Sequence, residues 1–317
     1  MISERVVTLC QVGALIYVEV VAFLEGSYYM ENILELEKVS KTFSKSGFRL
    51  DEVSFSLPYG TIMGIVGENG AGKTATIGCI LNTMARDSGE IKIFGKEMRD
   101  KDTDMREKIG VVYDGDNFPG YWTAKQLSQV MDGLYAQWDN ALFQKYLKDF
   151  SLPVDQKIKH YSRGMTMKLA IAAALSHHPQ LLILDEATSG LDPIMRDEML
   201  DVFLEFVQEE NHSILLSSHI TSDMEKVADY ITFIHDGELI LTASKDDLIY
   251  NYAVMRCKES RFRELDPEDI LAYRKRDFQI DVLTSDGKRA QKKYKDIVVD
   301  HVSVDEIMLL LVKGEHV

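Results

Sequence analysis

The sequence predicts an α/β fold in which a largely parallel sheet carries a phosphate-binding loop, and three observations predict it. A glycine-rich loop at residues 67–74 lies between an apolar segment and a helical one. Residues 181–184 and 213–218 are largely apolar runs without alternation, as in parallel strands that are buried on both faces. Ionisable residues follow both runs directly, at the strand ends where α/β sheets bind ligands.

The first 29 residues come before the segments that predict this fold. Residues 6–24 are almost wholly apolar and have about the length of a membrane span. Gln11 and Glu19 interrupt them, and a central acid costs about 3 kcal/mol on insertion scales. We therefore expect an over-extended reading frame with its functional start at Met30, and a membrane-adsorbed helix is the alternative.

The glycine-rich loop has the pattern G-x-x-x-x-G-K-T and joins a predicted strand to a predicted helix, the order that a phosphate-binding loop requires. Glycines let successive backbone N–H groups curl around a polyphosphate, and the helix N-terminus adds the positive end of its dipole. Lys73 would place its ammonium group against the β- and γ-phosphates, and the Thr74 hydroxyl would ligate Mg²⁺. The loop residues are Gly67, Glu68, Asn69, Gly70, Ala71, Gly72, Lys73 and Thr74. A turn that binds nothing is the alternative.

Other elements are predicted around this loop. Residues 32–39 and 48–57 are predicted to be strands beside it. From about residue 116 the pattern becomes helical, and aromatic residues recur at intervals compatible with buried helix faces. We favour core packing over a binding stripe for these residues. They are Trp122, Trp138, Phe143, Tyr146 and Phe150.

The segment Tyr-Ser-Arg-Gly-Met at residues 161–165 comes just before a helical pattern at residues 166–175. A serine and a glycine at a helix N-terminus offer a hydroxyl and free backbone N–H groups to an anion. Ser162 and Gly164 are therefore candidate phosphate contacts.

Three ionisable residues end the buried strands. Asp185 and Glu186 follow the run at residues 181–184, and His219 follows the run at residues 213–218. Asp185 can hold Mg²⁺ through water, and Glu186 can polarise the attacking water as a general base. An acidic pair could also merely begin a solvated turn. His219 lies at the same predicted sheet edge as Glu186, within reach of a γ-phosphate, although a lone histidine is more often structural.

The C-terminal third is predicted from the same local rules. Its elements are a helix that starts at Asp192-Pro193, a hairpin of residues 230–235 and 238–242, strands at residues 278–283 and 295–299, and an amphipathic helix at residues 303–312 that is capped by a serine. We expect the charged segments 258–276 and 288–295 to be solvated surface. A regulatory role is the alternative.

Composition agrees with these motifs. The chain has 317 residues, of which 45% are hydrophobic, enough for one main domain and a small appendage. The net charge of -15 argues against a protein held on nucleic acid, because neutralising phosphates needs clustered Lys and Arg. Cys10, Cys79 and Cys257 have no metal-binding spacing, which indicates a reducing compartment rather than a disulfide framework.

In this order the motifs resemble those of the ATP-binding subunits of ABC transporters, over about residues 32–246. Residues 67–74 match the Walker A loop, and residues 181–185 match the Walker B strand, with Glu186 as the catalytic carboxylate. The other matches are Ser162 and Gly164 in the signature motif, Asp192 in the D-loop at residues 189–192, His219 as the switch histidine, and Phe43 where the family places a ring against adenine. For Phe43, core packing is the alternative.

The chain departs from the family pattern at two sites. Tyr161, Arg163 and Met165 replace three residues of the usual Leu-Ser-Gly-Gly-Gln signature. Asp114 stands where the family has the Q-loop glutamine. A carboxylate can accept a hydrogen bond from water or approach Mg²⁺, but it cannot donate as an amide does. Asp114 is therefore a candidate metal ligand together with Thr74 and Asp185.

The resemblance implies a P-loop NTPase with a RecA-like core, an antiparallel β subdomain and a helical signature subdomain over residues 30–246. Residues 247–317 would form a small α+β extension. ATP and Mg²⁺ would be bound between two such subunits, in a homodimer or a heterodimer. The resemblance further implies a cytoplasmic ATPase, peripheral on the inner face of the cell membrane, where a separate integral membrane permease holds it.

Within the family, the chain is similar to the export-type ATPases of bacterial antibiotic and peptide efflux. The segment at residues 218–226 fits that branch. The alternative is a soluble ABC ATPase that acts on ribosomes or DNA. A single cassette without sustained heptads disfavours this alternative.

Overall fold

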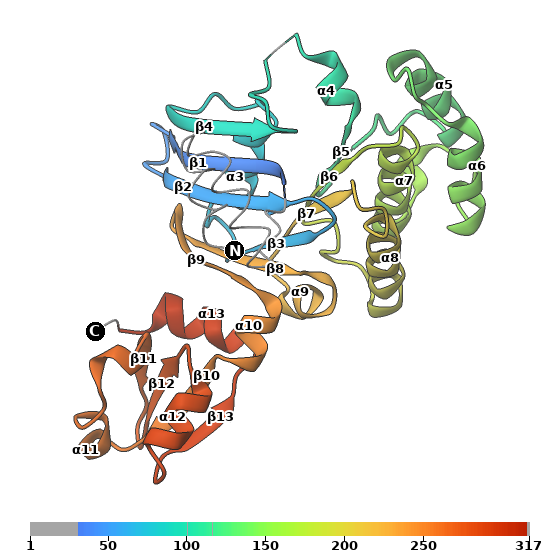
Figure 1. The fold of residues 1–317 in the computed structure, drawn as a ribbon. Coiled ribbons are helices and arrows are strands. Elements are labelled where there is room, and N and C mark those ends of the chain that lie inside the picture. Colours follow the sequence, from blue (N-terminus) through green and yellow to red (C-terminus); the bar gives the residue numbers. More distant parts are fainter. Residues whose placement is uncertain (1–30, 100, 116, 316–317) are drawn as a thin grey trace, which may run out of the picture.

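The computed structural model describes residues 31–99, 101–115 and 117–315. Figure 1 shows them as a larger part and a smaller part, the latter made by the C-terminal residues. The expectations for residues 1–29 and for a functional start at Met30 lie outside the described residues. Within the described ranges, no helix combines the length and the apolar character that crossing a membrane requires.

A nine-stranded sheet runs through the larger part of the described chain, in the order β4-β1-β2-β9-β8-β3-β7-β6-β5. Its strands are β1 (Asn32–Thr42), β2 (Arg49–Pro58), β3 (Ile62–Val66), β4 (Ser88–Ile93), β5 (Ile109–Val112), β6 (Leu181–Asp185), β7 (Ser213–Ser218), β8 (Tyr230–His235) and β9 (Glu238–Ser244). From β5 to β8 the neighbouring strands are parallel, whereas β4, β1 and β2 pair antiparallel. The predicted parallel core, the antiparallel subdomain and the β8–β9 hairpin are confirmed.

Strands β3, β6 and β7 are buried along their whole length. In β3, Ile62 and Val66 belong to one hydrophobic core, and Met63 and Ile65 belong to another. Successive side chains of a strand point to opposite faces, so a strand covered on both faces is apolar at most positions, with small or hydrogen-bonded polar residues at the others. This explains the largely apolar runs of the sequence.

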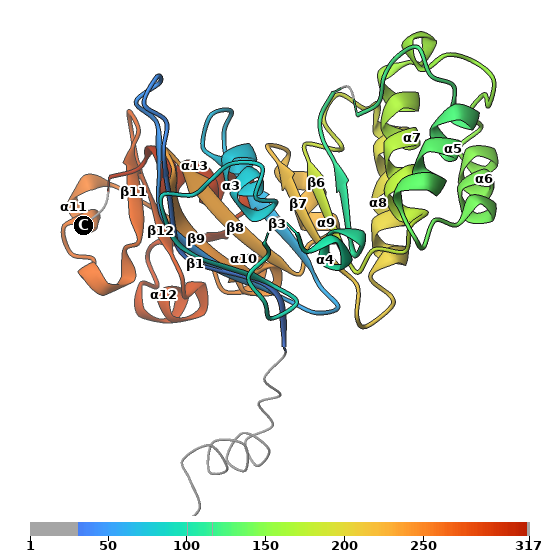
Figure 2. The ribbon, with the colours of Figure 1, turned by 90° about the horizontal axis from the view of Figure 1, so that it is seen from above.

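Helices cover this sheet and extend beyond one end of it. They are α3 (Lys73–Ile80), α4 (Thr103–Glu107), α5 (Ala124–Leu134), α6 (Asn140–Asp149), α7 (Arg163–Leu175), α8 (Pro193–Phe206) and α9 (Thr221–Val227), with a 3-10 helix at Ile158–His160. Helix α3 contributes to one of the two cores, and α7, α8 and α9 contribute to the other. Figures 1 and 2 show α5, α6 and α7 grouped beyond the β5 end of the sheet. This group is the predicted helical subdomain.

The helical subdomain has a core of its own. Phe143 is fully buried in it. Trp122, Trp138, Tyr146 and Phe150 are partly buried against the same core. The prediction that these aromatic residues pack rather than form a binding stripe is therefore confirmed.

The C-terminal residues form a second, four-stranded sheet in the order β11-β12-β10-β13. The elements are α10 (Lys245–Tyr250), β10 (Ala253–Cys257), α11 (Glu259–Phe262), a 3-10 helix at Pro267–Asp269, β11 (Ala272–Lys275), β12 (Ile280–Thr284), α12 (Gly287–Lys293), β13 (Val298–His301) and α13 (Val304–Lys313). Strands β12 and β13 begin later than predicted, and β10 and β11 lie where no strand is predicted. The predicted serine cap is Ser303, whose Oγ accepts a hydrogen bond from the Glu306 N–H at 3.2 Å.

The charged side chains of segments 258–276 and 288–295 are exposed or half-buried, as expected for solvated surface, except for Asp269, which is buried. A second buried aspartate of the smaller part, Asp281, lies outside these segments. Asp281 is 2% exposed and forms an ion pair with Arg276. Asp269 is 5% exposed, and its Oδ2 lies 2.6 Å from Lys293 Nζ. Burial raises the pKa of Asp269, but hydrogen bonds, first that from Lys293, outweigh it and hold this pKa below its ordinary value. Buried carboxylates persist when they are paired in this way.

Helix α13 joins the smaller part to the larger one. Val304 and Leu310 on α13 belong to the same hydrophobic core as Met224 on α9. The backbone N–H of Val304 also donates to Oε1 of Glu225 on α9, at 2.8 Å. A carboxylate at a helix N-terminus satisfies a free N–H group and favours the helix dipole. The second sheet is thereby attached to the helix that follows His219.

Candidate functional site

The glycine-rich loop runs into the N-terminus of α3. Gly72, the residue before this helix, has a φ of 116°, a left-handed conformation that side chains rarely adopt. A Cβ atom added to Gly72 would also lie 2.7 Å from Leu50 Cδ2. Only glycine fits this position. The first N–H groups of a helix have no partner within it, so the loop presents an anion-binding helix end.

Lys73 holds its charge inside this loop. Its side chain is 5% exposed, and Nζ donates to the carbonyl oxygens of Gly67 at 2.7 Å and of Glu68 at 3.1 Å. Nζ also lies 3.1 Å from Oε1 of Glu186. The loop carbonyls fix the position of the ammonium group, and phosphate oxygens can compete with Glu186 for it.

The two acids at the end of β6 are oriented by a serine on the neighbouring strand. The register of β6 and β7 places Asp185 opposite Ser217. Ser217 Oγ donates to Asp185 Oδ1 at 2.6 Å and accepts from the Glu186 N–H at 3.1 Å. Glu186 has a left-handed φ of 53°, and its Oε2 lies 2.7 Å from His219 Nδ1. Sequence reasoning missed Ser217, because nothing distinguishes it from any small residue of a buried strand.

A cavity of about 480 Å³ opens beside the loop and is lined by Phe43, Phe48, Lys73, Thr74 and Glu186, among others. The rings of Phe43 and Phe48 lie 5.9 Å apart, centroid to centroid, across a turn in which the Phe43 N–H donates to the Phe48 carbonyl at 2.8 Å. A nucleotide base can lie against these rings while its phosphates reach Lys73 and Thr74. The sequence predicts Phe43 but not Phe48. A second aromatic residue shortly after the first was the available signal.

The signature residues and the D-loop aspartate lie elsewhere. Ser162 caps α7, and its Oγ accepts from the Met165 N–H at 3.2 Å. Gly164 is buried so closely against α8 that an added Cβ would lie 2.1 Å from Met195 Sδ. Asp192 caps α8 by accepting from the Met195 N–H at 3.0 Å. Of the described residues, those lining the cavity beside Lys73 do not include Ser162, Gly164 or Asp192.

The two departures from the family pattern contact one another. Arg163 Nη2 lies 2.7 Å from Asp114 Oδ1, and the side chains are 53% and 45% exposed. The guanidinium group also covers Gly190, where an added Cβ would lie 2.5 Å from Nη1. One carboxylate oxygen of Asp114, a candidate metal ligand, is therefore engaged by the signature arginine. Sequence reasoning treated Asp114 and Arg163 as unrelated.

A buried aspartate and a half-buried arginine link the helices behind the site. Asp223 on α9 is 3% exposed, and its Oδ2 lies 4.0 Å from Nε of Arg196 on α8. Burial raises the pKa of Asp223, and the charges of Arg196 and His219 partly oppose this rise. The pair connects the helix after the D-loop to the helix after His219, and sequence reasoning selected neither member.

Comparisons with known proteins agree with this geometry. The ABC transporter family pattern matches residues 50–189. The bacitracin transport ATP-binding protein BcrA of Bacillus licheniformis is 33% identical over 213 residues, which are 67% of this chain and 69% of BcrA. The lantibiotic transport ATP-binding protein SrtF of Streptococcus pyogenes is 31% identical over 215 residues, 68% of this chain and 92% of SrtF. A solved ATP-binding subunit of an ABC transporter has a TM-score of 0.62 at 26% identity, covering 68% of this chain and 91% of that one.

Proposed function

The chain belongs to the ABC transporter family as an ATP-binding, ATP-hydrolysing subunit, and we propose that it drives export of an antibiotic, a peptide or a similar compound. The observation that carries the ATP-driven part of this proposal is that Lys73 and Glu186 line the cavity beside the glycine-rich loop and contact each other, with His219 bound to Glu186. The transport ATP-binding proteins for bacitracin and for a lantibiotic support the substrate class. Export would proceed through a separate membrane permease, which would hold the chain on the inner face of the cell membrane.

In the proposed binding step, the adenine lies against Phe43 and Phe48, and the polyphosphate follows residues 67–74 into the N-terminus of α3. Lys73 then exchanges the carboxylate of Glu186 for the β- and γ-phosphates. Thr74 and Asp185 supply a hydroxyl and a carboxylate, the oxygen ligands that Mg²⁺ prefers. When bound, Mg²⁺ neutralises charge on these phosphates.

Glu186 is the proposed general base of hydrolysis. Once Lys73 is engaged by phosphate, Oε1 of Glu186 is free to accept a proton from the attacking water. His219 keeps the carboxylate in place through the 2.7 Å contact between its Nδ1 and Oε2 of Glu186. The same histidine is close enough to the base to sense the γ-phosphate.

The positions of Ser162, Gly164 and Asp192 support action as a pair of subunits. These residues do not line the cavity beside Lys73 in the described part of the chain, so a nucleotide there would meet them from a second subunit. In this arrangement ATP bridges two chains, whether identical or different. Binding of ATP then favours the closed pair, because the ligand contacts both subunits only in that state.

An ATP-dependent dimer tests this arrangement. The Glu186→Gln variant should retain ATP and form a dimer in the presence of Mg²⁺, measured by light scattering. Adding Ser162→Arg should prevent that dimer while ATP remains bound at Lys73, as measured by equilibrium dialysis. A Glu186→Gln variant that stalls hydrolysis but remains monomeric would contradict a pair formed by this chain alone.

A genetic experiment tests the export proposal. Deleting the gene should increase sensitivity of the cell to peptide antibiotics, and the wild-type chain but not Glu186→Gln should restore resistance. Unchanged sensitivity to every such compound would contradict this substrate class. No observation favours the alternative of action on ribosomes or DNA, and a net charge of -15 disfavours nucleic-acid binding.

A further inference from the structure

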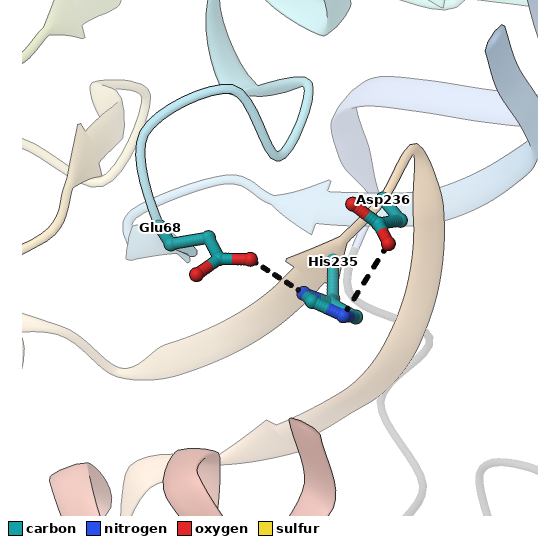
Figure 3. Close-up of side chains that lie close together, drawn as sticks. All are labelled: Glu68, His235 and Asp236. Carbon is teal, nitrogen blue, oxygen red and sulfur yellow. Dashed lines mark ion pairs between the residues drawn. The ribbon is translucent and has the colours of Figure 1, made fainter. Parts of the chain in front are cut away.

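Three potential metal ligands meet on the outer side of the glycine-rich loop. Glu68 belongs to the loop, His235 ends β8, and Asp236 lies in the turn between β8 and β9 (Figure 3). One ligand atom from each residue lies within 4.8 Å of the other two. We propose that Glu68, His235 and Asp236 form a binding site for a divalent transition-metal ion, with Zn²⁺ as the best fit.

The backbone holds these residues together independently of their side chains. The N–H of Gly237 donates to the Ala71 carbonyl at 2.9 Å, which joins the turn to the loop. At Gly67, an added Cβ would lie 2.3 Å from the Ile234 carbonyl oxygen, so the loop and the end of β8 are in direct contact. Asp236 adopts a left-handed φ of 45°, a conformation that aspartate tolerates better than most residues. The positions from which the ligands project are therefore set by the fold.

The charges of the cluster favour a cation. Oε1 of Glu68 lies 3.1 Å from Nδ1 of His235, and Oδ2 of Asp236 lies 3.7 Å from its Nε2. Among the ion pairs of the described residues, neither carboxylate is matched with a lysine or an arginine. Nδ1 of His235 is shielded from solvent and lacks an aligned hydrogen-bond partner. Two carboxylates around one imidazole thus carry uncompensated negative charge.

The donor set indicates the kind of ion. Imidazole suits zinc and its neighbours, and carboxylates complete such sites at about 2.0–2.2 Å, with water in the fourth position. One ion can take only one ring nitrogen of His235, so the carboxylates must converge on that nitrogen. Their side chains are 54% exposed at Glu68 and 85% exposed at Asp236, which leaves them free to move by the small distance required.

This site is separate from the proposed magnesium site at Thr74 and Asp185. An ion held by Glu68 would fasten the loop to the β8–β9 turn from outside. The Glu68 carbonyl is one of the two that hold Lys73 Nζ, at 3.1 Å. Metal binding would therefore restrain the residue that receives the phosphates, a consequence that rests on the proposed function, whereas binding of the metal itself does not.

Metal binding can be measured on the full chain without nucleotide. The protein, stripped with a chelator, is titrated with Zn²⁺ in competition with a chromophoric chelator, and Co²⁺ serves as a coloured probe of coordination. The wild type should bind one ion. His235→Ala should lower the affinity for this ion by at least about tenfold, because removing even an outer partner of a metal site lowers metal affinity 10- to 100-fold. Asp236→Asn, which keeps the shape of the side chain, should weaken binding in the same direction.

His178→Ala is the matched control, because His178 is an exposed histidine whose Nε2 lies 3.4 Å from a single carboxylate, Asp139. This variant should bind Zn²⁺ as the wild type does. Equal affinity of the wild type and of both site variants would overturn the proposal and leave the cluster as contacts of His235 with two carboxylates and no ion. Thermal melts of the variants with and without Zn²⁺ separate loss of the site from loss of the fold, because only a chain with the site should be stabilised by the ion.

Discussion

Lys73 and Glu186 contact each other directly, with Nζ 3.1 Å from Oε1, although they act at different steps of the proposed reaction. The first would receive phosphate, and the second would activate water. The same ammonium group cannot hold the carboxylate and the polyphosphate equally well. ATP binding is thereby linked to release of the general base, so hydrolysis would begin only after the phosphates have arrived.

Replacing Lys73 should remove ATP binding. Lys73→Ala deletes the charge that the loop carbonyls hold in place, and it also leaves Glu186 without its partner. We expect affinity for a fluorescent ATP analogue to fall below detection while circular dichroism stays unchanged. Lys226→Ala, which removes an exposed lysine from α9, should bind the analogue normally. Tight binding by Lys73→Ala would exclude the loop from the mechanism.

Replacing Glu186 should slow hydrolysis without weakening ATP binding. Glu186→Gln keeps the shape of the side chain but loses the base. Loss of a general base typically lowers the rate by about 10² to 10⁴, which corresponds to roughly 3–5.5 kcal/mol of barrier. Phosphate release under single-turnover conditions measures this rate. A normal rate would assign the base to another residue.

The Asp114–Arg163 pair should matter for coupling more than for stability. Exposed ion pairs contribute about 0.2–1 kcal/mol, so Asp114→Ala and Arg163→Ala should leave thermal unfolding almost unchanged. We expect each to lower the permease-stimulated ATPase rate more than the basal rate, because each frees the Q-loop from the signature helix. The exchanged pair, Asp114→Arg with Arg163→Asp, should recover part of the stimulation. If the permease stimulates the ATPase rate of both single variants as it does that of the wild type, the Asp114–Arg163 pair is a surface contact without a role in coupling.

Acidification should destabilise the chain through His177. This residue is 2% exposed, stacks on Tyr135 at 4.2 Å, and its Nδ1 lies 3.0 Å from the Glu107 carbonyl. Burial lowers the pKa of His177 below its ordinary value of 6.5. Below pH 6.5 the unfolded chain binds a proton at His177 that the folded chain does not bind. The free energy of unfolding therefore falls as the pH drops from 6.5 through the depressed pKa.

Urea unfolding at several pH values measures this effect. His177→Asn keeps a hydrogen-bond donor for the carbonyl but does not titrate, so its stability should depend less on pH below about 6.5 than that of the wild type. His178→Asn, at the exposed neighbouring position, should retain the wild-type slope. Identical slopes for the wild type and His177→Asn would contradict a role for His177.

Removing the carboxylate that caps α13 should loosen the C-terminal sheet. Glu225→Ala leaves the Val304 N–H without its partner, and loss of a helix cap costs about 1 kcal/mol. Hydrogen exchange should speed up in α13 first. The control is Glu259→Ala, which removes an exposed glutamate from α11 in the smaller part of the chain. This variant should leave hydrogen exchange in α13 unchanged. Equal exchange in Glu225→Ala and wild type would show that the apolar contacts alone attach α13.

Much of the fold and the centre of the site could be predicted from local sequence. The G-K-T loop between an apolar run and a helix identifies Lys73 as a phosphate ligand candidate. The strands that are covered on both faces can be recognised from their largely apolar runs. Ser217 could not be found, because it acts through the parallel register that sets it opposite Asp185. Sequence order does not reveal register.

The second sheet was harder to predict because charged residues interrupt the apolar pattern of its strands. The two strands that were not predicted, β10 and β11, contain Arg256, Arg274 and Lys275. A charged residue in a strand breaks the apolar pattern unless its partner is known, and the partner of Arg256, Asp300, is supplied by the tertiary structure. The contact between Asp114 and Arg163 escaped sequence reasoning for the same cause.

The attachment of α13 to α9 connects the C-terminal sheet with the region around His219. Helix α9 starts at Thr221, close behind His219, and its Glu225 is fastened to the first residue of α13. We therefore expect a displacement of the C-terminal sheet to reach α9 through α13, and a displacement of His219 to reach the sheet by the same contacts. Removing or exchanging the C-terminal extension should accordingly alter the position of His219, because α9 would lose the helix that packs on it.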